Sequence, residues 1–144
     1  MEKQPEIIVI DDEASIVKLV LSILKKGGFS ADFSTDSLKG LDLIKKKNYQ
    51  IVILDLCMPK ESGLVILSKI KKINPLIQVI IITGYSSEFS LKACLKAGAD
   101  EFICKPFEID DILGAVNRSI KKIENFEKIE TLEKINASEA AKKK

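Results

Sequence analysis

The sequence contains no histidine among its 144 residues. A Ser-His-Asp or Cys-His catalytic set is therefore excluded, and so is a chain that phosphorylates a histidine of its own. Cysteine is scarce as well, because only Cys57, Cys94 and Cys104 occur, and they are scattered without the paired spacing of a zinc site. We expect all three to be free, buried thiols.

Long apolar runs and excess charge are also missing. No apolar stretch approaches the roughly 20 residues that span a bilayer, and residues 1–6 lack the apolar region of a signal peptide. The net charge is +2, and residues 121–144 hold seven lysines against five glutamates, which leaves residues 1–120 balanced. We therefore expect a cytoplasmic protein that binds neither a membrane nor nucleic acid directly.

What the sequence does contain is a regular alternation of strand-like and helix-like segments. Four segments of strand length are apolar runs, and residues 29–33 alternate between apolar and other residues, as in an edge strand. Each of the five is followed by apolar residues at helical spacing, with connections of a few residues. This order predicts one α/β domain over residues 1–122, with a doubly wound parallel sheet of five strands and helices on both faces. The predicted strands are residues 6–10, 29–33, 51–54, 78–82 and 101–104.

The C-terminal segment, residues 123–144, has a different pattern. Its apolar residues Phe126, Ile129, Leu132 and Ile135 fall at every third position. Steps of three move around a helix and do not hold one stripe, so the pattern argues against a sustained coiled coil. We expect a helical extension, formed either by continuation of the fifth helix or by a short extra helix that packs back, with residues 137–144 frayed.

Polar side chains follow the predicted strands at the points where the strands end. Asp11 and Asp12 follow the first strand, Asp55 the third, Thr83 the fourth and Lys105 the fifth. The carboxyl ends of parallel strands lie on one edge of the sheet, where open α/β sheets bind their ligands. Three carboxylates at one edge repel each other unless a cation lies among them. An all-oxygen cluster suits Mg²⁺, which takes one or two carboxylates and keeps water ligands for an incoming phosphoryl group.

This residue set predicts phosphoryl chemistry at Asp55. A carboxylate can attack a phosphorus centre once the repulsion between the two groups is relieved, which a bound Mg²⁺ would do. Lys105 would place a positive charge on a phosphoryl oxygen, and the Thr83 hydroxyl would donate to another. Plainer interpretations exist, because Asp12 or Glu13 could cap the following helix, and Thr83 and Lys105 could be solvated. Independent accidents at four strand ends are less probable than a single site.

Five ordered motifs resemble one known family. They are residues 8–13 (IVIDDE), 53–59 (ILDLCMP) with Gly63, 82–85 (ITGY), 98–99 (GA) and 105–107 (KPF). Over residues 5 to about 122 the chain resembles the receiver domain of bacterial two-component response regulators. The resemblance implies the flavodoxin-like strand order 2-1-3-4-5.

The resemblance also assigns roles to individual residues. Asp55 would be the phosphoacceptor, and Asp11 and Asp12 would hold Mg²⁺ together with Asp55 and the main-chain carbonyl of Cys57. No residue at these catalytic or metal-binding positions departs from the family pattern.

The resemblance also implies residues that respond to phosphorylation by changing conformation. Thr83 would be the switch hydroxyl, Lys105 the phosphate-binding lysine, and the Lys105–Pro106 peptide bond would be cis. Phe102 stands where the family has an aromatic switch residue, three positions before the lysine, and it lacks the hydroxyl of the commoner tyrosine. A plain core residue is the alternative interpretation of Phe102.

Two positions vary within the family and flank the predicted site. Cys57 and Tyr85 lie two residues beyond Asp55 and Thr83 respectively. Both could affect how readily water reaches an acyl phosphate on Asp55. We expect them to tune the lifetime of the phosphoryl group without being essential.

The resulting hypothesis is a signalling switch and not an enzyme, apart from Mg²⁺-dependent self-phosphorylation and slow autodephosphorylation. A sensor histidine kinase or phosphotransfer protein would donate the phosphoryl group. The face built from the fourth helix, fifth strand and fifth helix would then change its preference for a downstream target, an output domain or a second copy. The chain would be either a stand-alone receiver or the receiver portion of a longer regulator.

Three alternatives remain. A phosphatase of the haloacid dehalogenase type needs an Asp two residues after the nucleophile, where Cys57 stands, and a nucleotide-binding protein needs a Gly-rich phosphate loop that the sequence lacks. A degenerate receiver that binds partners without phosphorylation is the stronger alternative. The intact acids and lysine argue against it.

Overall fold

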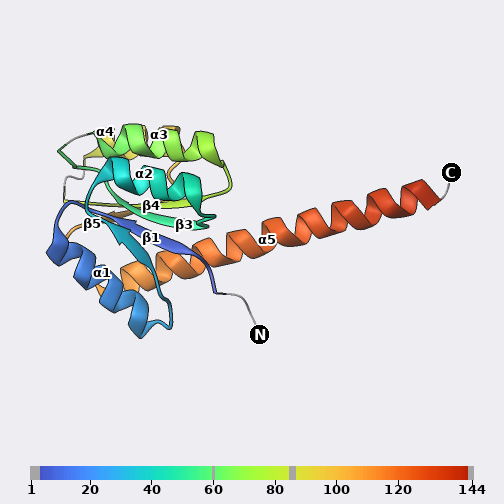
Figure 1. Ribbon diagram of the computed structural model, residues 1–144, viewed down its shortest axis with the longest axis horizontal. Helices are drawn as coiled ribbons and strands as arrows, with labels where there is room; N and C mark the ends of the chain where they lie inside the picture. Colours follow the sequence, from blue (N-terminus) through green and yellow to red (C-terminus); the bar gives the residue numbers. More distant parts are fainter. Residues whose placement is uncertain (1–3, 60, 85–86, 143–144) are drawn as a thin grey trace.

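The computed structural model describes residues 4–142 except residues 60, 85 and 86, and it forms a parallel sheet covered by helices on both faces (Figure 1). All strand pairs are parallel, and the order is β2-β1-β3-β4-β5, as predicted. The strands are β1 (Ile7–Ile10), β2 (Asp32–Ser34), β3 (Ile51–Asp55), β4 (Gln78–Thr83) and β5 (Glu101–Cys104). The helices are α1 (Ala14–Lys26), α2 (Ser37–Lys46), α3 (Gly63–Ile73), α4 (Glu88–Ala97) and α5 (Ile109–Lys142).

The three central strands are buried at every position. β1, β3 and β4 consist mainly of isoleucine and valine, whose branched side chains suit a pleated surface covered on both sides. Alternate residues therefore point into two separate cores. Burial of each such side chain contributes about 1.5–3 kcal/mol, so the central strands anchor the fold.

The two cores lie on opposite faces of the sheet. One is closed by α2, α3 and α4, and the other by α1 and the first turns of α5 (Figure 1). The first core takes Ile8, Ile10, Val52, Leu54, Val79 and Ile81 from the sheet. The second takes Ile7, Val9, Ile51, Ile53, Ile80, Ile82 and Ile103.

The edge strand β2 is shorter and begins later than predicted. It comprises residues 32–34, whereas the alternating pattern predicted residues 29–33. Phe29 is used differently, because its N–H donates to the carbonyl of Leu24 (2.9 Å) and helps to close α1. The side chain of Phe29 packs against the second core, so this residue ends a helix and does not begin a strand.

Helix α5 has two parts with different surroundings. Ile112, Ala115, Val116 and Ser119 are buried against the sheet, whereas every residue after Ile123 is exposed as far as Lys142. The exposed part projects away from the domain as a straight continuation of the helix (Figure 1).

Helix α5 continues through the extension as far as Lys142, and the fraying expected from Ala137 stays a prediction. The helix runs on to Lys142 because the segment after Ala115 contains neither glycine nor proline, and Ala137, Ala140 and Ala141 are strong helix formers. The domain boundary at residue 122 stays a prediction. No helix in the described part of the chain has the length and apolar character needed to cross a membrane.

Candidate functional site

The carboxyl edge of the sheet brings together the residues that the sequence placed at the strand ends. Asp11 directly follows β1, Asp55 and Thr83 are the last residues of β3 and β4, and Lys105 directly follows β5. The parallel register aligns these ends, with Asp55 opposite Ile82 and Thr83 opposite Cys104. The four strands therefore deliver their polar side chains to one place.

Three carboxylates and one ammonium group form the centre of the site. One oxygen from each of Asp11, Asp12 and Asp55 lies within 4.8 Å of the others. Lys105 reaches between two of them, with its Nζ 3.4 Å from Asp11 Oδ2 and 3.6 Å from Asp55 Oδ2. Asp11 and Asp55 are only 3% and 4% exposed, whereas Asp12 is exposed. The cluster thus opens to solvent on the side of Asp12.

The site holds more negative charge than Lys105 can balance. Burial, and then the charge of Asp11, raise the pKa of Asp55 to about 6, although the Cys57 N–H and Lys105 act in the opposite direction. Burial alone would lower the pKa of Lys105, but the negative charges of Asp55 and Asp11 outweigh burial and raise it. The donor set is all oxygen and remains acidic with Lys105 present, so the residues fit a hard cation such as Mg²⁺.

Backbone hydrogen bonds fix the orientation of the two buried carboxylates. Asp11 Oδ1 accepts from the N–H of Glu13 (2.9 Å), and Asp55 Oδ1 accepts from the N–H of Cys57 (3.2 Å). In each case the other oxygen, Oδ2, is the one that faces Lys105. The alternative role as a helix cap finds no support, because Glu13 occupies the N-cap position of α1 without a side-chain cap hydrogen bond.

Gly63 shapes the loop that follows Asp55. A Cβ atom at this position would lie 2.5 Å from the main-chain oxygen of Asp55 and from the Cα of Leu56, which is closer than real atoms approach. The Gly63 N–H also donates to the carbonyl of Leu56 (2.9 Å). The sequence named Gly63 as part of a motif, and the structure gives the steric reason: only glycine lets α3 begin so close to the Asp55 backbone.

Thr83 and Cys57 lie beside each other at the rim of the cluster. Thr83 is fully buried, and the sulfur of Cys57 lies 3.9 Å from its hydroxyl oxygen. The Thr83 carbonyl accepts from the main-chain N–H of Lys105 (2.8 Å). The last residue of β4 therefore carries the Thr83 hydroxyl and also holds the main chain of Lys105.

The remaining predicted residues have mixed outcomes. The Lys105–Pro106 peptide bond is cis. Phe102 is partly buried and packs against the core on the side of α2, α3 and α4. Tyr85 lies outside the described residues.

The prediction of three buried thiols was wrong for two of them. Cys94 is buried, whereas Cys57 and Cys104 are exposed, and all three are free. Cys57 belongs to the loop after β3, and Cys104 is the last residue of the edge strand β5, where the helices no longer cover the sheet.

Comparisons with known proteins agree with this architecture. The response regulator receiver domain matches residues 7–117. The transcriptional regulatory protein DltR of Streptococcus agalactiae is 34% identical over 110 residues, which are 76% of this chain and 49% of DltR. A response regulator receiver domain protein from Clostridium thermocellum is 34% identical with a TM-score of 0.80, and the similarity covers 85% of this chain and 98% of that protein. The receiver domain of the Francisella response regulator 1452 is 29% identical with a TM-score of 0.78, covering 83% and 99% respectively.

The fold and the acidic cluster define the class of receiver-like α/β proteins. The chain belongs to the response regulator receiver domain family of two-component systems. It spans about half the length of DltR, 49%, and 25% of the ZraR protein of Klebsiella oxytoca, so the family membership concerns the receiver portion of such regulators.

Proposed function

We propose that Asp55 accepts a phosphoryl group from a phosphohistidine of a sensor histidine kinase or phosphotransfer protein. The N–P bond of the donor breaks as a bond forms between the phosphorus and an Asp55 oxygen, and the freed imidazole stays on the donor. The observation that carries this proposal is the buried Asp55 carboxylate, whose Oδ2 lies 3.6 Å from Lys105 Nζ and beside Asp11 and Asp12. The sequence has no histidine, so the phosphohistidine donor lies outside these 144 residues.

The proposal gives each neighbouring residue a task. Asp11, Asp12, Asp55 and the main-chain carbonyl of Cys57 would hold Mg²⁺, which when bound supplies the positive charge that offsets repulsion between Asp55 and the phosphoryl oxygens. Lys105 lies 3.6 Å from Asp55 and would bind a phosphoryl oxygen. The protein is thus modified at its own carboxylate and does not act on outside substrates.

Thr83 and Phe102 would transmit the change. The buried Thr83 hydroxyl can donate to a phosphoryl oxygen, and its movement would alter the space available to Phe102 on the neighbouring strand. We propose that the face formed by α4, β5 and α5 then changes its preference for a downstream target, an output domain or a second copy. Cys57 contacts the Thr83 hydroxyl and would tune the phosphoryl lifetime, and the same is proposed for Tyr85.

An exposed apolar groove near the site offers the donor protein a place to dock. It lies between α1 and the segment after Lys105, with a volume of about 500 Å³. Its apolar lining residues are Leu19, Ile23, Phe107 and Ile109, and the acidic residues Glu108 and Asp110 line it as well. Leu19 and Ile109 are 48% and 43% exposed. Docking here would hold a partner's histidine near the carboxyl edge. We propose that this transfer takes place in the cytoplasm.

Intact mass measurement tests the proposal. The protein is incubated with acetyl phosphate, in Mg²⁺ or in excess EDTA, and compared with Asp55→Asn. We expect the wild-type protein to gain the mass of one phosphoryl group only in Mg²⁺, and Asp55→Asn to gain none. Equal labelling of the two proteins would contradict the assignment of Asp55.

The degenerate receiver, which binds partners without phosphorylation, is the competing function. The complete set of acids and the contact between Lys105 and Asp55 disfavour it. Absence of any labelling of the wild-type protein, with Mg²⁺ binding intact, would favour it instead.

A further inference from the structure

A second concave surface lies at the opposite edge of the sheet from Asp55. We call it the amino-edge groove; its volume is about 390 Å³, within the range of pockets that bind ligands. One wall is the loop between α3 and β4, with Leu76 and Ile77, and the other is the exposed part of α5, with Ile123, Phe126 and Ile129. Tyr49, which is itself buried, lines it as well.

Each wall carries apolar side chains that face solvent, although Ile77 is buried. Leu76 is 55% exposed, Phe126 41% and Ile129 53%. Apolar residues that gather on two facing walls form a contiguous patch, which marks an interaction site more often than single exposed residues do.

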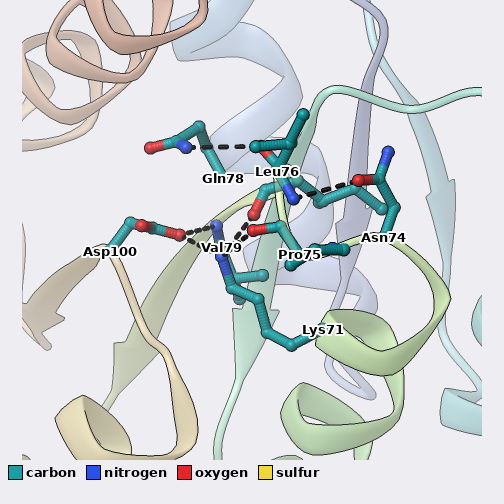
Figure 2. Close-up of polar contacts among 8 residues, drawn as sticks. Lys71, Asn74, Pro75, Leu76, Gln78, Val79 and Asp100 are labelled. Atoms are coloured by element: carbon teal, nitrogen blue, oxygen red, sulfur yellow. Dashed lines mark hydrogen bonds and ion pairs between the residues drawn. The ribbon is translucent and has the colours of Figure 1, made fainter. Parts of the chain in front are cut away.

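The wall that carries Leu76 is held in place by polar contacts (Figure 2). The Leu76 N–H donates to Asn74 Oδ1 (3.0 Å), and the Leu76 carbonyl accepts from the side-chain amide of Gln78 (3.3 Å). Lys71 donates to the carbonyls of Pro75 and Ile77 on either side of Leu76. The exposed leucine is therefore fixed before any partner arrives, which lowers the entropic cost of binding.

The charged side chains that line the groove are all acidic. Glu127, Glu130 and Glu133 line it from α5, together with the neutral side chains of Asn74 and Gln50. Among the described ion pairs, these glutamates make one contact, from Glu130 to Lys134 at 3.7 Å, and both side chains are well exposed. A pair of this kind contributes little, so the groove favours a cationic occupant.

The position of the groove indicates which secondary structure the occupant has. It lies at the ends of β3 and β4, which are inner strands paired on both sides, so no strand edge is free there to accept an added strand. An amphipathic helix can instead place apolar side chains at successive turns between Leu76 and Ile129.

We propose that the amino-edge groove binds a basic amphipathic helix of a partner protein. Its apolar side chains contact Leu76, Phe126 and Ile129, and its lysine or arginine side chains pair with Glu127 and Glu133. The groove lies at the far edge of the sheet from the acidic cluster, so this binding is a function additional to phosphoryl acceptance.

Fluorescence anisotropy with a designed probe tests the proposal. The probe is a fluorescein-labelled Leu/Lys peptide of about 18 residues, or five helical turns, with leucine at positions three and four residues apart. A matched peptide replaces lysine with glutamate. We expect saturable binding of the Leu/Lys peptide and a Kd at least about tenfold weaker for the Leu/Glu peptide.

Variants of the full chain locate the binding. Ile129→Ser, Leu76→Ser and the double variant Glu127→Lys/Glu133→Lys should each weaken the Leu/Lys peptide by about tenfold or more. Leu95→Ser on α4 and Glu139→Lys near the end of α5 are matched controls, since Leu95 is 57% exposed and both lie outside the groove, and they should change Kd less than about twofold.

Three outcomes would overturn the proposal. The first is the absence of saturable binding, and the second is equal loss of affinity in Ile129→Ser and Leu95→Ser. The third is a dimer in sedimentation velocity that Ile129→Ser dissociates, because a second copy would then occupy the groove.

Discussion

Two lysine–aspartate clusters lie at opposite edges of the same sheet, and their hydrogen bonding differs. At the amino edge Lys71 Nζ lies 2.7 Å from Asp100 Oδ2, which also accepts from the Val79 N–H at 2.9 Å (Figure 2). At the carboxyl edge Lys105 lies 3.4 Å and 3.6 Å from two different aspartates. The amino-edge cluster has short contacts that satisfy its lysine and aspartate, and we call it the saturated cluster. The carboxyl-edge cluster has longer contacts and more negative charge than its lysine balances.

The difference separates a structural cluster from the candidate functional one. Lys71 also donates to the carbonyls of Pro75 and Ile77, so charge and protons are matched within the fold. Asp55 keeps a pKa raised to about 6, because burial and Asp11 oppose its ionisation more than Lys105 supports it. Groups that remain unbalanced in the folded protein mark a place for a ligand or a reaction.

The largest effect on stability should come from the saturated cluster. Asp100→Ala leaves the part-buried Lys71 ammonium without its counter-charge and the Val79 N–H without its side-chain acceptor, although Lys71 keeps its two carbonyl acceptors. We expect the free energy of unfolding to fall by about 2–4 kcal/mol.

Urea denaturation followed by circular dichroism measures the change in Asp100→Ala. Lys69→Ala is the control, because the contact of Lys69 with Glu61 is more exposed, and it should cost less than about 1 kcal/mol. Equal effects of the two variants would show that the amino-edge cluster contributes no more than a surface pair.

The unbalanced cluster should respond with the opposite sign. In EDTA at pH 7 the Asp55 carboxylate is charged in a site that resists its charge, and Asp55→Asn removes that charge while its side-chain oxygen can still accept from the Cys57 N–H. We expect the free energy of unfolding to rise by about 1–3 kcal/mol.

The size of the stability gain from Asp55→Asn depends on pH. The folded protein holds the Asp55 proton up to a pKa of about 6, against 3.8 for an ordinary aspartate carboxyl, so acid favours the folded wild-type protein. The advantage of Asp55→Asn is therefore full above pH 6 and disappears as the pH falls towards 3.8. Denaturant titrations at several pH values measure it, and a gain that stays constant across this range would contradict the proposed cause.

The smallest effect concerns Mg²⁺. If the carboxyl edge holds the ion, Mg²⁺ at about ten times its Kd should stabilise the protein by about 1.4 kcal/mol. Asp11→Asn should lose most of this stabilisation, whereas Asp100→Asn, in the saturated cluster, should keep it.

Thermal unfolding with and without Mg²⁺ gives the comparison for these variants. NaCl at the same ionic strength separates specific binding of Mg²⁺ from screening. A stabilisation that Asp11→Asn retains in full would remove Asp11 from the metal site.

The sequence predicted the carboxyl edge better than the amino edge for a physical reason. Parallel strands end together, so Asp11, Asp55, Thr83 and Lys105 could be brought to one place from strand boundaries alone. Asp100 and Lys71 are 29 positions apart and lie on a loop and a helix face, where no periodic pattern relates them. The contact depends on the packing of α3 beside the α4–β5 loop, which only the three-dimensional structure supplies.

Smaller differences have similar causes. The start of β2 was misplaced because an apolar residue such as Phe29 suits both the end of α1 and the start of a strand. The main-chain hydrogen bond that places Phe29 at the end of α1 cannot be recognised from the residue type. The buried thiols were predicted from average behaviour, whereas exposure of Cys57 and Cys104 follows from where the helices stop covering the sheet. Gly63 stood within a recognised motif, but the reason for glycine there is a backbone contact.

Helix α5 belongs both to the core and to the solvent, and this gives it the geometry of a lever. Its first turns rest on the sheet through Ile112 and Val116, and the part beyond Ile123 extends for about 28 Å at 1.5 Å per residue. A rotation of about 10° at the base would therefore move the far end by about 5 Å, more than the side chains at the pivot move themselves. A partner bound near Lys142 would register a change in the packing of α5 as a displacement of several ångströms, whereas the same rotation would move Ile129, in the wall of the amino-edge groove, by only about 1.6 Å.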